Sequence, residues 1–331
     1  MLFLRGFSRY ISNYMKVTEH IAQANDTLIS FEILPPLKGK SIESIYDHLD
    51  PLMEFKPSYI NVTYHRSEHM FKKRADGSFD KVEIRKRPGT VGICAAIMNH
   101  YSVDAVPHLI CGGFSKEETE NALIDLNFLG IDNVLVLRGD APKNETFFEA
   151  HPNGHRYALE LLNQVVQMNN GIYLEEDLMG GIKTKFCIGV AGYPEKHFEA
   201  PNLQTDLGYL KRKVEAGADY IVTQMFFDNQ KFFDFVTRCR EAGITVPIIP
   251  GLKPLTTKKQ LSVLPRTFHV DMPDEFAQEV MKCKTDKEVE TVGTEWLIQQ
   301  SRELKAAGVP VLHYYTLGKP HVVQQVVAAI K

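Results

Sequence analysis

The sequence predicts an α/β fold, a (β/α)8 or TIM barrel with extra helices and long βα loops, on three observations. Eight apolar segments occur, most of them with a polar residue at or near the end, helical segments follow them, and the 331 residues exceed the roughly 250 that such a barrel needs. Strands of a parallel barrel are buried on both faces, so they are apolar along their length. Their polar last residues should then meet at the C-terminal mouth of the barrel.

The eight expected strands are short and rich in Val, Ile, Leu and Phe, as buried strands are. Most carry a polar residue at or near the end that should face the mouth. We therefore expect one rim of polar side chains rather than several separate surfaces. In chain order the strands are residues 28–31 before Glu32, 59–62 before Thr63, 105–110 with His108, 133–137 before Arg138 and Asp140, 186–192 before Tyr193, 220–223 before Gln224, 248–251 and 311–316.

Helical segments separate these strands. Regular alternation of this kind favours parallel strands joined by right-handed crossovers. The rival fold is an open doubly wound sheet, which would carry a G-x-G-x-x-G turn after an early strand, and the sequence has neither that turn nor a P-loop. Apolar spacing, capping residues and terminal glycines predict helices near 42–55, 115–130, 157–168, 203–216, 229–242 and 321–330, with two or three more within 252–310.

Three segments interrupt this alternation. Residues 65–90 are basic and without a clear period, so we expect a long loop over the barrel mouth, with a solvated charged excursion as the alternative. Residues 141–185 form a second long connection around one helix. Residues 1–14 contain two arginines and no acid, and we expect a flexible extension before a single barrel domain at 15–331, with a targeting peptide as the alternative.

Composition narrows the possible partners. The formal charge of −3 gives no reason to expect nucleic acid or an anionic membrane, and no apolar run approaches the roughly 20 residues that a membrane-spanning helix needs. The five cysteines are scattered, which favours reduced thiols in the cytoplasm over a disulfide frame or a zinc site. His65 and His69 have the spacing of metal ligands, but no third candidate lies nearby, so we expect no metal.

Two of the strand ends suggest acid–base chemistry and phosphate binding. Glu32 ends a nearly continuous apolar strand, so its carboxyl should be partly removed from water, which suits a general acid; a salt-bridged structural acid is the alternative. Arg138-Gly139-Asp140 combines a guanidinium, which suits phosphate, with a carboxylate that can tune a cofactor ring.

A second set of residues could hold a ribose and a diphosphate. Tyr193 and His197 offer an aromatic face and an imidazole after the fifth strand, and Asp206 and Lys213 share one helix face. A solvated helix face is the simpler interpretation of Asp206 and Lys213. His108, inside an apolar strand, could equally be a hydrogen-bonded core histidine. These residues indicate a barrel enzyme with a large, polar ligand and leave the reaction open.

In combination, these motifs resemble the catalytic domain of the methylenetetrahydrofolate reductase family. Each motif is weak singly, but together they follow the family order from about residue 28 to 317. They are Phe31-Glu32-Ile33-Leu34-Pro35-Pro36, Val62-Thr63-Tyr64, Pro107-His108-Leu109, Leu137-Arg138-Gly139-Asp140, Tyr193-Pro194-Glu195-Lys196-His197, Thr223-Gln224-Met225-Phe226-Phe227-Asp228, Ile249-Pro250-Gly251 and His313-Tyr314-Tyr315-Thr316-Leu317.

The resemblance implies a barrel that holds FAD without a covalent bond. NADH or NADPH would give a hydride to the flavin and leave. Methylenetetrahydrofolate would then take its place and be reduced to methyltetrahydrofolate, a ping-pong reaction that supports methionine synthesis. The choice between the two nicotinamides stays open. The family also implies a homo-oligomer, either a dimer or a tetramer.

The resemblance also assigns roles by motif position. Glu32 corresponds to the general acid that protonates a folate nitrogen, and Asp140 to the aspartate beside the flavin. Substrate-binding positions are those of Glu32, Gln224, Tyr315 and Lys319. Flavin-contacting positions are those of Thr63, His108, Arg138, Gly139, Asp140, Tyr193, His197, Asp206 and Lys213.

Three positions depart from the bacterial pattern. Tyr209 stands where relatives often have an asparagine that contacts the flavin, Leu264 replaces an aromatic residue expected to stack on a ligand, and Lys319 replaces an arginine. Two other functions remain as alternatives. One is a different flavin barrel, such as a proline dehydrogenase, against which the motifs around Glu32 and Gln224 argue. The other is a folate-binding barrel without redox chemistry.

Overall fold

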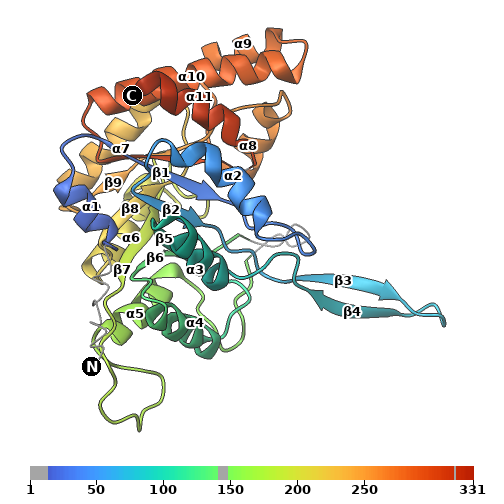
Figure 1. Cartoon of the computed structure of the whole chain (residues 1–331), viewed down its shortest axis with the longest axis vertical. Helices are drawn as coiled ribbons and strands as arrows, with labels where there is room; N and C mark the ends of the chain where they lie inside the picture. Colours follow the sequence, from blue (N-terminus) through green and yellow to red (C-terminus); the bar gives the residue numbers. More distant parts are fainter. Residues whose placement is uncertain (1–13, 141–147, 317) are drawn as a thin grey trace, which may run out of the picture.

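The chain forms a barrel of parallel strands surrounded by helices (Figure 1). The computed structural model describes residues 14–140, 148–316 and 318–331. Its main sheet has the strand order β10-β11-β1-β2-β5-β6-β7-β8-β9, in which all neighbours are parallel. β9 (Ile248–Ile249) and β10 (Gly251–Leu252) are halves of one strand interrupted by Pro250, which has no N–H. Among the described residues, the predicted eight-stranded barrel is therefore confirmed.

The other strands lie close to their predicted positions. Their residues are buried almost throughout, as the apolar composition predicts. They are β1 (Leu28–Ile33), β2 (Tyr59–Val62), β5 (Asp104–Ile110), β6 (Asn133–Leu137), β7 (Cys187–Gly192), β8 (Tyr220–Thr223) and β11 (Val311–Tyr315).

Helices surround this barrel, and capping residues set several of their starts. Ser115 accepts from the backbone N–H of Glu118, and Glu118 closes the capping box that the sequence predicts. The predicted helices are confirmed, and α3, which the sequence analysis missed although Ile93, Cys94, Ile97 and Met98 have helical spacing, joins them. They are α1 (Val17–Gln23), α2 (Glu43–Met53), α3 (Thr90–Tyr101), α4 (Lys116–Phe128), α5 (Ala158–Asn169), α6 (Leu203–Glu215), α7 (Asn229–Glu241), α8 (Gln260–Phe268), α9 (Asp274–Lys282), α10 (Asp286–Ala306) and α11 (Pro320–Ile330). None of the described helices combines the length and apolarity that a membrane crossing requires.

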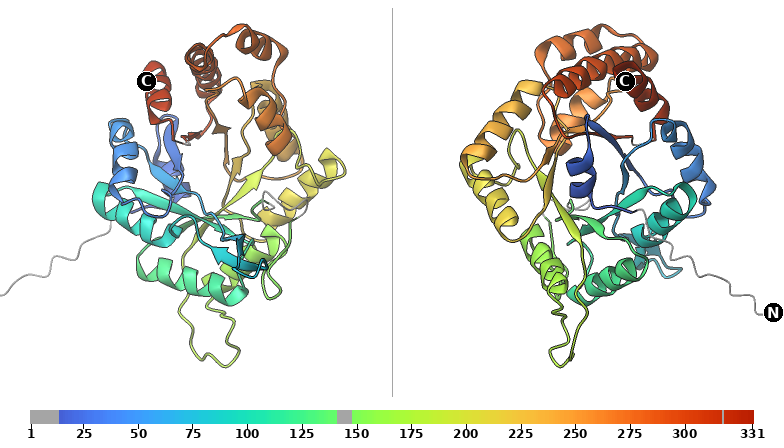
Figure 2. Two further views of the ribbon diagram at one scale, coloured as in Figure 1. Left: turned by 90° about the vertical axis from the view of Figure 1, so that its right-hand side faces the viewer. Right: turned by 60° about the vertical axis from the view of Figure 1, so that its left-hand side comes forward.

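Helix α1 closes the N-terminal end of the barrel, and it appears in the middle of the ring in the right-hand view of Figure 2. Val17 is fully buried in a cluster with barrel residues such as Tyr59 and Val106. Its backbone N–H donates to Asn133 Oδ1 at 2.9 Å, and Asp104 accepts from the backbone N–H of Met15 at 3.1 Å. Ligands must therefore approach the barrel from the opposite, C-terminal end.

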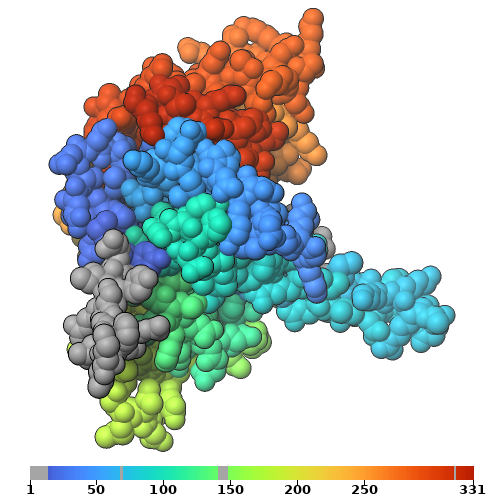
Figure 3. All heavy atoms as spheres, viewed as in Figure 1, coloured from blue at the N-terminus to red at the C-terminus, as the bar shows by residue number. Residues whose placement is uncertain are grey.

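Residues 65–90 form a hairpin, so the prediction of a loop over the mouth is wrong. β3 (Glu68–Lys73) and β4 (Phe79–Ile84) pair antiparallel, and Figures 1 and 3 show them standing out from the body. In β4, exposed residues alternate with half-buried ones, among them Val82 and Ile84, but this alternation is short and lies within a basic segment, so it gives only a weak strand signal. Of the predicted N-terminal extension, residues 1–13 lie outside the described residues, and the Tyr14 hydroxyl donates to the Met98 carbonyl at 3.0 Å.

Gly293→Ala should destabilise the fold, because α10 crosses the β10–α8 connection without space for a side chain at this position. A Cβ on Gly293 would overlap the carbonyl oxygen of Leu255. We expect the free energy of unfolding to fall by about 1–3 kcal/mol, as in other overpacked sites. Urea denaturation would measure the change. The control is Gly208→Ala on α6, where nothing lies within 4 Å of the added Cβ and a gain of about 0.5–1 kcal/mol is expected.

Candidate active site

The centre of the barrel mouth holds a carboxylate between two imidazoles. Glu32 Oε2 lies 3.4 Å from His108 Nε2 and 3.6 Å from His313 Nε2. All three side chains are buried, and Glu32 is only 7% exposed. Each imidazole is held by a neighbour: His313 Nδ1 lies 2.8 Å from Ser30 Oγ, and His108 Nε2 lies 3.3 Å from Asn61 Nδ2.

The environment of His108 keeps its ring neutral at physiological pH. Burial lowers the pKa of His108 to about 4, although the nearby Glu32 acts in the opposite direction. Within the described part of the chain, two buried polar atoms at this centre, Asn61 Oδ1 and His313 Nε2, make no hydrogen bond. Unsatisfied buried polar atoms are costly, so they mark places where a polar ligand or water would bind.

Lys253 is a member of this centre that the sequence analysis missed. It directly follows β10 and is 7% exposed. Burial lowers the pKa of Lys253 to about 8, with Glu32 opposing that effect. The rule that located Glu32, a polar residue after an apolar strand, applies equally to Lys253 and could have found it.

We call Glu32, His108, His313 and Lys253 the central group. Tyr315 links this group to the neighbouring strands. Its hydroxyl donates to the Thr223 carbonyl at 2.6 Å. Burial raises the pKa of Tyr315, and Glu32 adds to that effect. The predicted Gln224 follows immediately on β8, where its backbone N–H donates to the Gly192 carbonyl at 2.8 Å and its Oε1 accepts from the backbone N–H of Met225 at 2.9 Å. The side chain of Gln224 is thus folded against its own turn.

A second polar group lies at the ends of β6 and β7 and on α6. The Tyr193 and His197 rings pack edge to face with centroids 4.7 Å apart. The backbone N–H of His197 donates to Asp206 Oδ2 at 2.9 Å, and Lys213 Nζ donates to the Ala191 carbonyl at 2.7 Å. Burial lowers the pKa of Lys213 to about 8, opposed by Asp206. The structure therefore brings together these four residues, as predicted.

Arg138 belongs to the same group and has a partner that the sequence analysis missed. Its Nη2 donates to Glu199 Oε1 at 3.0 Å, and its guanidinium lies 5.0 Å from the centre of the Phe148 ring. The hydrogen bond from Arg138 holds the pKa of Glu199 below its usual range. A phosphate that binds Arg138 would have to compete with Glu199. No local pattern around Glu199 distinguishes it from other surface acids.

The remaining predicted residues of this rim are less buried. Asp140 is exposed, and Gly139 has a φ of +84°, a left-handed conformation that glycine adopts without strain. Thr63 Oγ1 lies 3.4 Å from His65 Nε2. Among the described residues, no group of three His, Cys, Asp or Glu side chains could hold a metal ion, and the His69 side chain lies outside that description.

A cavity of about 540 Å³ opens beside the central group. His108 of the central group lines it, together with Tyr64, Lys40, Arg85 and residues of α2, α3 and α4. Glu32 is not among the lining residues, so the cavity adjoins the central group through His108, and its lining is mostly apolar with a few polar groups. These properties are typical of sites for small molecules.

Comparison with known proteins decides the family. The family model described as methylenetetrahydrofolate reductase matches residues 16–331. The chain belongs to this family. It is 31% identical to 5,10-methylenetetrahydrofolate reductase of Escherichia coli over 88% of this chain and 86% of the relative. It is 32% identical to methylenetetrahydrofolate reductase (NADH) 1 of Arabidopsis thaliana over 92% of this chain, but spans only 48% of that relative's length.

A solved structure has the same fold at low sequence identity. It is an uncharacterised protein from Clostridium thermocellum that binds two copies of 5-methyl-5,6,7,8-tetrahydrofolic acid. The TM-score is 0.55 at 13% identity, over 95% of this chain and 97% of that one. At this identity the likeness supports the barrel fold and nothing more.

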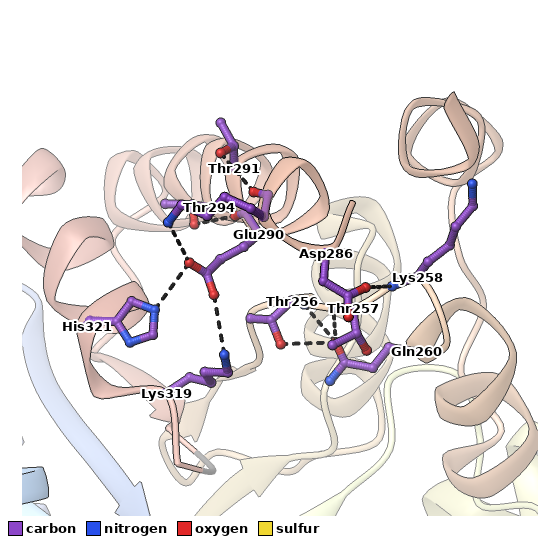
Figure 4. Close-up of polar contacts among 11 residues, drawn as sticks. Thr256, Thr257, Lys258, Gln260, Asp286, Glu290, Thr291, Thr294, Lys319 and His321 are labelled. Atoms are coloured by element: carbon purple, nitrogen blue, oxygen red, sulfur yellow. Dashed lines mark hydrogen bonds and ion pairs between the residues drawn. The ribbon is translucent and has the colours of Figure 1, made fainter. Parts of the chain in front are cut away.

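Lys319, where bacterial members of the methylenetetrahydrofolate reductase family often have arginine, contacts an acid on α10 (Figure 4). Its Nζ lies 3.5 Å from Glu290 Oε2. Glu290 Oε1 also lies 3.0 Å from Lys287 Nζ and 3.2 Å from His321 Nε2. The structure therefore directs the predicted substrate contact Lys319 toward α10 and not toward the central group.

The other two departures from the family pattern have structural roles of their own. Leu264 is buried among residues of α8, α9 and α10, where it packs with Phe276. Tyr209 is exposed on α6, and the Arg212 guanidinium lies 4.9 Å from its ring centre. Neither side chain lies in the two polar groups at the mouth.

Proposed function

We propose that this chain reduces 5,10-methylenetetrahydrofolate to 5-methyltetrahydrofolate with a hydride from NADH or NADPH. The observation that carries the proposal is Glu32, a buried carboxyl at the mouth of a barrel of this family, with an imidazole on either side. A proton donor so placed is what opening the five-membered ring of the substrate requires. We also propose that the protein works in the cytoplasm, since its five cysteines are free thiols.

The residues at the ends of β6 and β7 fit FAD. Arg138 and Lys213 supply cations for a diphosphate, and Asp206 and His197 supply partners for ribose hydroxyls and neighbouring oxygens. Gly139, in its left-handed conformation, lets the backbone approach a flat ring closely. When bound, FAD would accept the hydride from the nicotinamide and pass it to the folate. Thr63, Tyr193 and Asp140 would flank it.

In this proposal the residues of the central group transfer the proton that the reaction needs. Glu32 gives its proton to a nitrogen of the folate. His313, whose Nε2 lies 3.6 Å from Glu32 Oε2, is close enough to return a proton to it after modest movement, while the neutral His108 ring stays beside it at 3.4 Å. Ser30 and Asn61 orient the two rings. On the β8 side, we propose that Gln224 and Tyr315 contact the folate.

The visible absorbance of the purified protein provides a direct test of this function. The purified protein should be yellow, and anaerobic NADH or NADPH should bleach its flavin absorbance because hydride transfer reduces the ring. Addition of methylenetetrahydrofolate should restore the absorbance. Stopped-flow comparison of the two nicotinamides would identify the preferred donor. A correctly folded but colourless protein that binds folates would instead support a binding role without redox chemistry.

A further inference from the structure

The hairpin carries an unpartnered face with both aromatic and basic residues. Phe71, Lys73, Phe79 and Lys81 alternate along β3 and β4, so their side chains lie on one face, which we call the arm face; Glu83 lies on the same face, nearer the base of the hairpin. All four are exposed, Phe71 at 69% and Phe79 at 61%. Figure 3 shows the hairpin projecting from the body.

A hairpin that projects into solvent leaves its aromatic side chains exposed to water, which is energetically unfavourable. An isolated two-stranded hairpin is marginally stable in water and normally gains stability by packing on another surface. Exposed apolar patches rimmed by charge typically mark protein–protein interaction sites. We therefore expect the arm face to bind a partner surface that is acidic and partly apolar.

The same chain provides a surface with those properties. The connection between α5 and β7 carries three consecutive acids, Glu175, Glu176 and Asp177, followed by exposed apolar residues; we call residues 172–182 the acidic loop. Met179 is 93% exposed and Ile182 is 77% exposed. Figures 1 and 2 show this loop extending well beyond the barrel.

The arm face and the acidic loop of one chain are too far apart to meet. The hairpin follows the C-terminal end of β2, whereas the loop precedes the N-terminal end of β7, so they leave opposite ends of the parallel barrel. Residues 65–90 contain eight Lys or Arg and four Asp or Glu, a formal charge of +4, which leaves −7 for the rest of the chain. The complementary surface is thus available on a second copy.

We propose that the arm face of one copy binds the acidic loop of a second copy. Lys73 and Lys81 pair with Glu175, Glu176 and Asp177, while Phe71 and Phe79 pack on Leu178, Met179 and Ile182. Two such contacts related by a two-fold axis close as a dimer, because each copy offers one arm face and one acidic loop. Burial of the exposed rings supplies affinity, and the charges set the pairing.

Charge reversal tests this pairing without touching the barrel mouth. The arm variant is Lys73→Glu with Lys81→Glu, and the loop variant is Glu175→Lys with Glu176→Lys. Each variant alone places like charges at both contacts, and we expect its dissociation constant to rise by about tenfold or more. An equimolar mixture of the two variants places opposite charges at both contacts. The mixture should therefore associate again, with an affinity near that of the unaltered chain.

Light scattering and sedimentation velocity over a concentration series would measure the masses. Lys284→Glu, which reverses an exposed lysine outside both surfaces, is the matched control and should associate like the unaltered chain. Thermal unfolding, measured at a concentration at which every chain is monomeric, should be unchanged in each variant, since the altered residues are exposed. A monomeric unaltered chain, undiminished association of both single variants, or a mixture that stays monomeric would each overturn the proposal.

Discussion

Replacement of Glu32 by glutamine should stop folate reduction while the reduction of the flavin by NADH or NADPH continues. The amide has the shape of the carboxyl and keeps the contacts around His108 and His313, but it cannot deliver the proton that ring opening needs. Loss of a general acid typically slows a reaction by about 10²–10⁴-fold. Anaerobic stopped-flow measurement of the two half-reactions would separate the two effects.

The matched control for this experiment is Glu120→Gln. Glu120 is also a buried carboxylate, but it lies on α4 and accepts from the backbone N–H of Leu174 at 2.8 Å, away from the mouth. Both half-reactions should survive this change. Loss of flavin reduction in Glu32→Gln, with folate reduction by prereduced enzyme intact, would contradict the role proposed for Glu32.

Lys253→Met should stabilise the protein near neutral pH. Burial lowers the pKa of Lys253 from 10.5 to about 8, so the folded state binds this proton less tightly than the unfolded state. The resulting destabilisation is fully present below about pH 8 and disappears as the pH rises toward 10.5. Removal of the ammonium should raise the free energy of unfolding by about 1–3 kcal/mol at pH 7.

Urea denaturation of both proteins between pH 7 and 10 would measure this difference. The gain should shrink as the pH rises, because the native lysine loses its charge over that range. Lys284→Met, at an exposed lysine, should change stability by no more than about 0.5 kcal/mol at any of these pH values. A gain from Lys253→Met that does not vary with pH would show that packing, and not a buried charge, is responsible.

Buried elements were predictable from the sequence, because burial on both faces makes the barrel strands continuously apolar and burial on one face gives the helices a periodic pattern. Glu32 and His108 could be assigned to a common rim, since parallel strands deliver their last residues to one end of a barrel. The hairpin was missed, because only a short stretch around Val82 and Ile84 shows the alternation of a half-buried strand. Helix α3 was also missed: its buried residues have helical spacing, but its glycine and β-branched residues lower its helix propensity.

Contacts between segments that are far apart in the sequence could not be predicted either. The pairing of Arg138 with Glu199, and of Lys319 with Glu290, depends on how separate loops and helices meet, which no local pattern encodes. Lys253, in contrast, was predictable, because it is a polar residue that follows an apolar strand. It was passed over because the short strand around Pro250 carries no polar residue within its own length.

The position of α1 limits how two substrates can use the barrel. With one end filled by Val17 and its neighbours, molecules enter and leave by the same passage. In the proposed reaction, a nicotinamide and a folate that both bind at the base of this opening would exclude each other. Each would then have to leave before the other binds, so a barrel that is closed at one end favours alternating binding of the two.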